Sequence, residues 1–375
     1  WRKLAMNVRR RGQLPLWNPY SFAGTPLLAN FQSAVFYPLN ILFFLTSAAA
    51  GWGILIFLQP LLAGVFLYLY LRHLELQPLS CLVGAFCWAF SGFFVAWLEW
   101  GTILHTVLWL PLILLAIEKI LVPSHSLRPQ QRWGWPVIWL VAMVCSFFAG
   151  HLQVFFYLFL FSLIYLIWQG LRVKHERQRI IFLFIILYSL FVILTSVQWR
   201  PTWEFIHLSA RGVDQVDWQK PGWFLPWQHL VQFLAPDFFG NPTTLNYWGE
   251  WNYGEFVGYI GVIGLLLAGL ALFYNRARQT TFFLIAGVVA LSFALPTPWA
   301  KLPYLWHFPL IGTSQPTRLL VIVDFCLAVL AALGMETLLR RGKIARAVAS
   351  LLGCIPLCDF WFCWHPGFGR RPIGW

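Results

Sequence analysis

The residues that could do chemistry gather in a few polar, aromatic segments that separate long apolar runs. The richest of these is residues 198–255, where carboxylates, arginines and aromatic rings follow one another. A guanidinium group can hold a phosphate through paired hydrogen bonds, and acids, amides and rings can hold a sugar. The alternative for each residue is an ordinary place in a solvated loop. The candidate ligand-binding residues of this segment are Glu204, Arg211, Asp237, Asn252, Tyr253 and Glu255.

A second polar segment, residues 12–40, reads GQLPLWNPYSFAGTPLLANFQSAVFYPLN. Its four prolines forbid a long helix, because proline lacks a backbone donor and clashes with the preceding turn. Its aromatic and amide side chains suit a surface that stacks on and hydrogen-bonds a sugar. An interfacial aromatic belt without any ligand is the alternative. The candidate residues here are Trp17, Asn18, Asn30 and Gln32.

Three further candidates stand where apolar runs begin. His151 and Gln153 occupy a short turn, where polar side chains at a membrane surface need partners. His151 could act as a general base or contact a phosphate, and it could equally be a hydrogen-bonded structural residue. Arg318 follows the polar segment 298–317 at the depth of lipid headgroups, which suits a lipid phosphate as well as an ordinary anchoring arginine.

The composition shows which solvent surrounds these segments. Hydrophobic residues make up 59% of the 375 residues and charged residues only 10%, against roughly 25% charged in a soluble domain. Lipid must therefore supply most of the surroundings. The net charge of +13 does not indicate nucleic-acid binding, because the basic residues are dispersed over short loops.

The elements that position the candidates are apolar runs long enough to cross a bilayer, which takes roughly 17 to 25 helical residues. About ten such runs predict an all-α, polytopic transmembrane helical bundle with irregular outer loops. They cover residues 53–73, 79–97, 103–121, 134–149, 153–170, 180–197, 256–274, 280–297, 318–338 and 344–363.

The positive-inside rule orients this bundle, because the short loops 122–133, 171–179, 275–279 and 339–343 are basic and hence cytoplasmic. Residues 1–52 then form a first extracytoplasmic loop with interfacial helices. Residues 53–340 form the multi-span domain, which includes the outer loop 198–255, and residues 341–375 form a last span and a tail. The basic start of the chain also lands outside, so we expect a further span upstream of a truncated N-terminus.

Two acids fall in the ninth apolar run. Glu336 is near the cytoplasmic end, where we expect its side chain to reach the interface, and this leaves Asp324 alone inside the membrane. A transporter would be expected to show paired midplane charges, inverted repeats or Gly/Pro-broken helices in matching positions, and the sequence shows neither matching halves nor a charge ladder. The seven cysteines form no zinc-binding pattern, and we expect them to be packing residues.

Several motifs together resemble the bacterial YfhO family of membrane proteins: LPLWNP and FYPLN in the opening stretch, WLPL at 109–112, GHLQ at 150–153, NYGEFVGYIG and QPTRLL. The resemblance runs from residue 1 to about 340 and is most specific in the opening stretch. It implies a bundle like that of the GT-C glycosyltransferases in the bacterial cytoplasmic membrane. Such enzymes use a polyprenyl-phosphate-linked sugar donor on the extracytoplasmic face, here to modify an envelope polymer or protein acceptor.

The resemblance also implies roles for particular residues. Arg211 or Arg318 would neutralise the leaving lipid phosphate, and Glu204, Asp237 or Glu255 would bind the sugar or the acceptor. The catalytic Asp of GT-C enzymes lies in the first outer loop and acts on the acceptor or holds a divalent metal ion. No acid precedes Glu75 here, so that residue is expected upstream of Trp1.

Two other functions fit the same surfaces. A transporter or flippase for a lipid-linked saccharide would need the aromatic and basic segments together with a path through the helices. A non-enzymatic membrane scaffold would use the outer loops to dock a partner. Flipping without transfer would favour the first, and loss of partner binding without loss of sugar transfer would favour the second.

Overall fold

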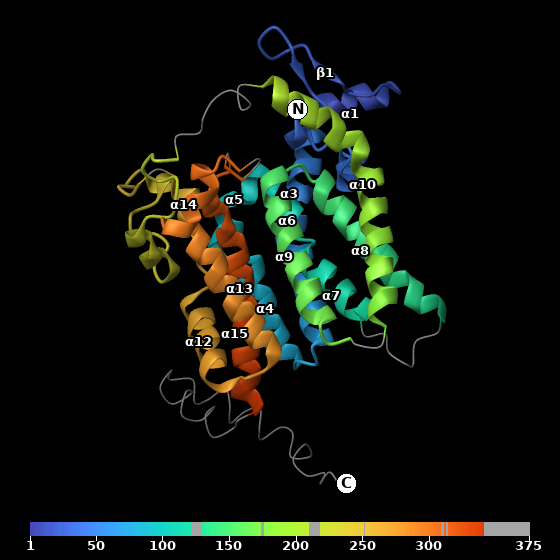
Figure 1. Ribbon diagram of the computed structural model, residues 1–375. Coiled ribbons are helices and arrows are strands. Elements are labelled where there is room, and N and C mark those ends of the chain that lie inside the picture. The colour runs from blue at the N-terminus through green and yellow to red at the C-terminus, as the bar shows by residue number, and fades with distance from the viewer. Residues whose placement is uncertain are drawn as a thin grey trace.

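The computed structural model is a bundle of helices with a short two-stranded hairpin at one end (Figure 1). We call the end with the hairpin the upper end, as in Figure 1, and the opposite one the lower end. The structure describes residues 1–121, 129–173, 176–209, 218–250, 252–308, 311–312 and 314–340, with only the backbone for 129–133.

Among the described residues, five helical segments are long and apolar enough to cross a membrane, and two bent pairs raise the number to seven. In the pairs, α4 and α5 differ in direction by 42° and α13 and α14 by 61°. The long segments are α3 (Ala48–His73), α6 with α7 (Ile103–Val107 and Leu110–Leu121), α9 (Leu152–Gly170), α10 (Arg177–Leu208) and η7 with α15 (Pro316–Leu319 and Leu320–Arg340). The pairs are α4 (Pro78–Ala89) with α5 (Gly92–Trp97) and η3 (Leu98–Trp100), and α13 (Arg278–Ala294) with α14 (Pro298–Leu305).

The predicted all-α, multi-span fold is confirmed. Two shorter apolar helices, α8 (Pro129–Phe148) and α12 (Val262–Tyr274), complete the set that the predicted runs describe. The predicted last span, 344–363, lies outside the described residues.

Helix α10 continues eleven residues beyond the predicted end of its run at residue 197. Its upper part is held by the N-terminal segment: Gln198 Nε2 donates to the Leu28 carbonyl at 2.8 Å, and Thr202 Oγ1 donates to the Ala29 carbonyl at 3.1 Å. Pro201 is tolerated inside this helix. The first part of the predicted outer loop 198–255 is therefore helical.

Helix α12 begins six residues later than the predicted run at 256. Two glycines explain the delay. Gly261 has φ +88°, which only glycine adopts without strain, and a Cβ on Gly258 would lie 2.6 Å from the Phe233 ring. Residues 257–261 are therefore extended rather than helical.

Residues 1–47 form a cap on the upper end, with its own small core around Met6, Leu27 and Phe43. Its basic residues bond to backbone carbonyls: Arg2 NH2 donates to Gly101 at 2.6 Å and Arg10 NH2 to Phe43 at 2.7 Å. The basic start of the chain thus has a structural use at this end. The cap contains α1 (Arg2–Arg10), β1 (Trp17–Asn18) paired with β2 (Thr25–Pro26), η1 (Phe31–Ser33), η2 (Pro38–Ile41) and α2 (Leu42–Leu45).

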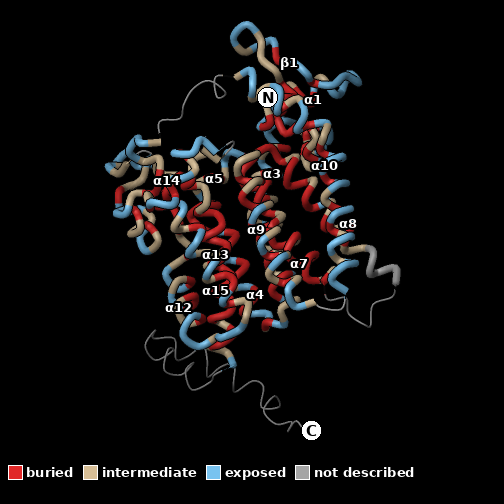
Figure 2. Tube along the Cα trace, viewed as in Figure 1, coloured by how far each residue is buried: buried red, intermediate tan, exposed pale blue. Residues whose placement is uncertain are grey.

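Helix α15 is buried along most of its length and packs against α4, α12 and α13 (Figure 2). Close approach depends on small residues, since a Cβ on Gly334 would overlap the Leu267 carbonyl oxygen. Glu336 lies near the lower end of α15 beside the exposed Arg340, but its own carboxylate is not open to solvent. Glu336 is 5% exposed, pairs with Arg340 at 2.6 Å and accepts the Gln77 N–H at 2.8 Å. Burial between α4 and α15 makes the paired state more favourable than solvation.

Candidate functional site

A buried ion pair forms the centre of the candidate site at the upper end. Arg318 of η7 donates from NH2 and Nε to Glu255 Oε1, at 3.0 and 3.3 Å. Its NH1 donates to Gln153 Oε1 of α9 at 2.7 Å. Glu255 lies in α11 (Tyr253–Phe256) and accepts the Thr317 hydroxyl on Oε2 at 3.0 Å. Three predicted residues that are far apart in the sequence therefore meet here.

The Arg318 guanidinium retains binding capacity. It lies over the Trp97 ring of α5, with 5.6 Å from Cζ to the ring centroid, and its side chain is 23% exposed while that of Glu255 is 4% exposed. A guanidinium has five N–H donors, and the bonds to Glu255 and Gln153 use three of them. The other two can bond an anion, whereas Glu255 is fully engaged in orienting the arginine.

Gln153 connects this cluster to a neighbouring loop. Its amide nitrogen donates to the Tyr157 hydroxyl at 2.9 Å and to the Gln315 carbonyl at 2.5 Å. Because α9 presents Gln153 and Tyr157 one turn apart, both side chains lie on the same helix face. This arrangement fixes the amide oxygen toward Arg318.

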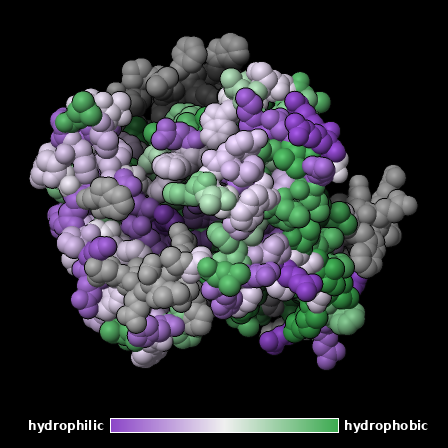
Figure 3. Space-filling model, turned by 90° about the horizontal axis from the view of Figure 1, so that it is seen from above, coloured by the Kyte–Doolittle hydropathy of each residue, from purple (hydrophilic) through white to green (hydrophobic). Residues whose placement is uncertain are grey.

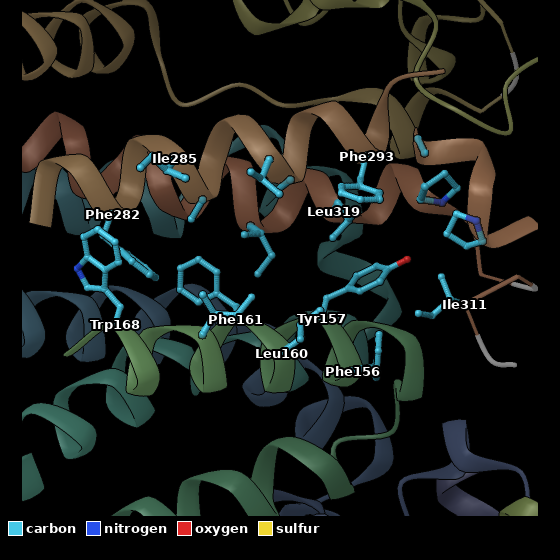
Figure 4. A pocket seen from close by; sticks show the side chains of 18 of the residues that line it. Phe156, Tyr157, Leu160, Phe161, Trp168, Phe282, Ile285, Phe293, Ile311 and Leu319 are labelled. Atoms are coloured by element: carbon cyan, nitrogen blue, oxygen red, sulfur yellow. The ribbon is translucent and has the colours of Figure 1, made fainter. Parts of the chain in front are cut away.

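An apolar groove of about 480 Å³ lies between α9 and α13 (Figure 4). Tyr157 and Leu319 line its upper part, and Trp168 and Phe282 its lower part. The distance from Tyr157 to Trp168 along α9 is about 16 Å. Ile164 and Val289 are half exposed at its edge, so a chain can enter from the surrounding lipid. Figure 3 shows a hydrophilic hollow near the centre of the upper end.

Asp237 and Tyr253 form a second polar group on the same loop. The Tyr253 hydroxyl donates to Asp237 Oδ1 at 2.7 Å, and Asn241 Nδ2 donates to the same oxygen at 3.0 Å. Burial, and then the neighbouring Asp237, raise the pKa of Tyr253 above its ordinary value. Asp237 is exposed and keeps its second oxygen for a hydroxyl donor. Asn252 caps α11, where its side chain accepts the Gly254 N–H at 3.3 Å.

The four predicted residues of the N-terminal cap have local contacts instead of contacts with the Arg318 cluster. Asn18 is 3% exposed and bonds Ser21 and the Tyr20 N–H inside the hairpin, and Asn30 caps η1 by accepting the Gln32 N–H at 3.2 Å. Trp17 and Gln32 are exposed. A role for these residues in sugar binding stays a prediction.

The remaining predicted residues have separate positions. His151 is 7% exposed and caps α9, since its Nδ1 accepts the Val154 N–H at 3.2 Å, which gives it a structural use. Glu204 is exposed on the upper part of α10. Arg211 lies outside the described residues. No group of three or more His, Cys, Asp or Glu residues suited to a metal ion occurs in the described part of the chain.

Sequence reasoning missed three members of the cluster. Trp97 stood inside an apolar run, where an aromatic residue carries no signal of its own. Thr317 and Gln315 stood beside Arg318 in the QPTR motif, and the position of this motif just before a span could have indicated them.

The fold is that of a polytopic helical membrane protein. Its candidate site consists of Arg318 with the partners Glu255 and Gln153, and of an apolar groove. The sequence matches the family model of the bacterial membrane protein YfhO over residues 26–367. The chain therefore belongs to the YfhO family, as the motifs predicted. Comparison with curated proteins and with solved structures gives no match.

Proposed function

We propose that this chain belongs to an integral membrane glycosyltransferase that uses a polyprenyl-phosphate-linked sugar. The observation that carries the proposal is the apolar groove whose upper part is lined by Tyr157, Pro316 and Leu319, which are neighbours of Gln153 and Arg318 in space or sequence. An isoprenoid chain fits the groove because its lining is almost entirely hydrocarbon. The phosphate at the end of such a chain would then lie beside the two guanidinium N–H groups that remain available.

The same geometry suits the transfer step. When the sugar leaves its carrier, negative charge develops on the lipid phosphate, and an oriented guanidinium stabilises that charge. Glu255 and Gln153 hold the guanidinium before substrate arrives, so little reorganisation is needed. Asp237, with an exposed carboxylate oxygen beside Tyr253, is the candidate for binding sugar or acceptor hydroxyls.

The proposal places the upper end on the extracytoplasmic side of a bacterial cytoplasmic membrane. The short connections and helix ends at the lower end carry Arg72, Arg172, Arg276 and Arg278, as the positive-inside rule requires of the cytoplasmic side. Arginines of the cap are instead bonded to protein carbonyls. An envelope polymer or protein would be the acceptor.

A flippase for a lipid-linked saccharide is the second candidate, because the two bent helix pairs resemble the broken helices of transporters. Both bends lie in the upper half of the bundle, at the Asp324 contact with α5 and at the top of α13. A site that opens to one side fits transfer better than transport.

The test is sugar transfer by membranes that contain the full-length protein, with a labelled polyprenyl-phosphate sugar and with and without EDTA. Ala286→Phe would fill the groove, and we expect transfer and retention of the lipid carrier to fall more than tenfold. Val288→Phe is the control, because this residue is on the same helix, is 57% exposed and does not line the groove. Equal activity of the two variants would remove the groove from the mechanism, and vectorial flipping without transfer would favour the flippase.

A further inference from the structure

Residue positions along η7 and α15 can be used to assign depths in the membrane to the upper half of the bundle. Arg318 and Arg340 lie 22 residues apart along η7 and α15, which is about 33 Å at the helical rise. The hydrocarbon core of a bilayer is about 30 Å thick. The two arginines therefore mark the two headgroup levels, and positions between them can be given a depth.

On this scale α12 begins near the middle of the membrane. A Cβ on Gly334 would overlap the Leu267 carbonyl oxygen, so these two residues lie at the same level. The two helices run in the same direction, and Val262, the first residue of α12, therefore lies level with Val329. That level is about 16 Å below Arg318. Helix α12 covers only the lower half of α15.

The space above α12 is filled by chain that forms only short helical turns, residues 224–250 and 252–261, which we call the lateral module. It contains η5 (Trp227–Phe233), η6 (Pro242–Thr244) and α11, and Figure 1 shows it beside α14 and above α12. The module starts at the upper end of α13, where the Leu225 N–H donates to the Ala294 carbonyl at 2.8 Å.

The module then descends. The Gly92 N–H donates to the Tyr259 carbonyl at 2.5 Å, and the adjacent Phe93 N–H donates to Asp324 Oδ2 at 3.4 Å. Tyr259 is therefore at the depth of Asp324, about 9 Å below Arg318. Non-helical backbone at such depth must be buried in protein. Phe256, Val257 and Ile260 are at most 4% exposed, which satisfies this condition.

The outer surface of the module carries large apolar residues as well as polar ones such as Asp237. Residues 221–259 include no Lys or Arg, and they are rich in Trp, Tyr and Phe. Aromatic residues favour the interface between headgroups and hydrocarbon. The surface continues downward into the lipid-facing side of α12, where Ile263 and Leu266 are exposed. Its large exposed apolar residues are Trp227, Leu234, Phe238, Leu245 and Trp248.

We propose that the lateral module is embedded in the leaflet at the upper end and contacts lipid through these five residues. It is then part of the membrane domain, and not a solvated loop above it. The proposal rests on the depths assigned from positions along α15, and it does not depend on sugar transfer.

The test is photolabelling of the wild-type protein in phosphatidylglycerol and phosphatidylethanolamine vesicles that contain a lipid with a diazirine near the acyl carbonyl. A second preparation carries the diazirine at the chain terminus. Mass spectrometry then compares adducts in three peptides. The lipid-facing reference is α10, where Ile193 is 65% exposed, and the water-facing reference is the hairpin, where Phe22 is 101% exposed.

We expect the shallow probe to label residues 227–248 as strongly as α10 and to leave the hairpin unlabelled. The deep probe should label the start of α12 and spare the module. The proposal is overturned if the shallow probe labels α10 and does not label the module. It is also overturned if the hairpin is labelled as strongly as the module, because labelling would then report exposure and not depth.

Discussion

Two arginines at the upper end, Arg2 and Arg318, have similar surroundings and different uses. Each lies over a tryptophan ring, Arg2 at 5.3 Å from the Trp52 centroid and Arg318 at 5.6 Å from that of Trp97. Arg2 is 8% exposed and donates to the Gly101 carbonyl and the Asn40 amide oxygen. Burial lowers its pKa to about 10, against a partial upward effect of Tyr37.

Arg318 instead pairs with a carboxylate, stays partly exposed and lies above an apolar groove. The difference teaches that stacking on tryptophan does not by itself make a binding site. A structural arginine donates to backbone carbonyls and is closed off, whereas a binding arginine is oriented by an acid and keeps donors for a ligand. Each prediction below separates these two roles.

The largest effect is expected for Arg318→Gln. Loss of a group that stabilises developing phosphate charge should reduce sugar transfer by about 100-fold or more, while the protein still folds. Transfer from labelled polyprenyl-phosphate sugar measures this, with the thermal midpoint in detergent as a check on folding. Arg179→Gln, at an exposed position on the lower end, should leave transfer unchanged. Near-normal transfer by Arg318→Gln would remove Arg318 from the site.

The second prediction concerns Arg2→Met, which should act on stability. It removes charged hydrogen bonds to Gly101 and Asn40, and we expect a loss of about 2 kcal/mol. Lys3→Met is the matched control, since Lys3 is the exposed neighbour. Denaturant midpoints in detergent micelles compare the two variants. Equal stability would contradict a structural role, and loss of lipid binding with normal stability would make Arg2 a ligand contact.

A smaller effect is expected for Thr317→Val, which keeps the shape of the side chain. It deletes the bond to Glu255 Oε2, and a bond of this kind contributes about 1 kcal/mol. Glu255 would orient Arg318 less firmly, so transfer should fall about fivefold, mainly in kcat. Thr195→Val, whose hydroxyl bonds its own helix, serves as the control. An unchanged rate would show that the bonds from Arg318 orient Glu255 sufficiently.

The sequence predicted the long spans because their signal is local. A run such as residues 320–340 is apolar throughout, and no long-range contact is needed to recognise it. It also predicted Arg318, Glu255 and Gln153 from residue type and position beside spans. The start of α12 and the bend after α4 were missed because they depend on contacts between distant residues, such as Gly92 with Tyr259.

The site was predicted only as separate residues for the same reason. Composition shows that Arg318 is near headgroup depth, but which acid it pairs with depends on how α9, α11 and η7 pack. Likewise, the groove exists only because α9 and α13 are separated, and the distance between two helices cannot be predicted from the sequence of either one. The burial of Glu336 was not predicted, because it depends on how Gln77 at the start of α4 packs against α15.

The smallest expected effect is a pH response that distinguishes the lateral module from the N-terminal cap. His229 is fully buried, donates from Nδ1 to Gln232 Oε1 at 2.7 Å and accepts the Glu250 N–H on Nε2 at 3.4 Å, so it is neutral. Burial lowers its pKa, and the Gln232 bond and Glu250 offset only part of this.

The imidazole of the unfolded module titrates near 6.5. Below that pH the unfolded module therefore binds more protons than the folded module. The folded module must then lose stability as the pH falls toward the lowered pKa of folded His229. Hydrogen exchange at pH 7.5 and 5.5, corrected for intrinsic rates, should therefore show faster opening of residues 227–250 at the lower pH. The hairpin at Trp17–Pro26 should not change. In His229→Gln the difference between the two pH values should disappear, and a persistent difference would assign the response to another group.

Because His229 packs on Phe256, next to Glu255, at 4.7 Å between ring centroids, a response confined to the module would also show that acidification loosens the support of Arg318 and leaves that of Arg2 intact.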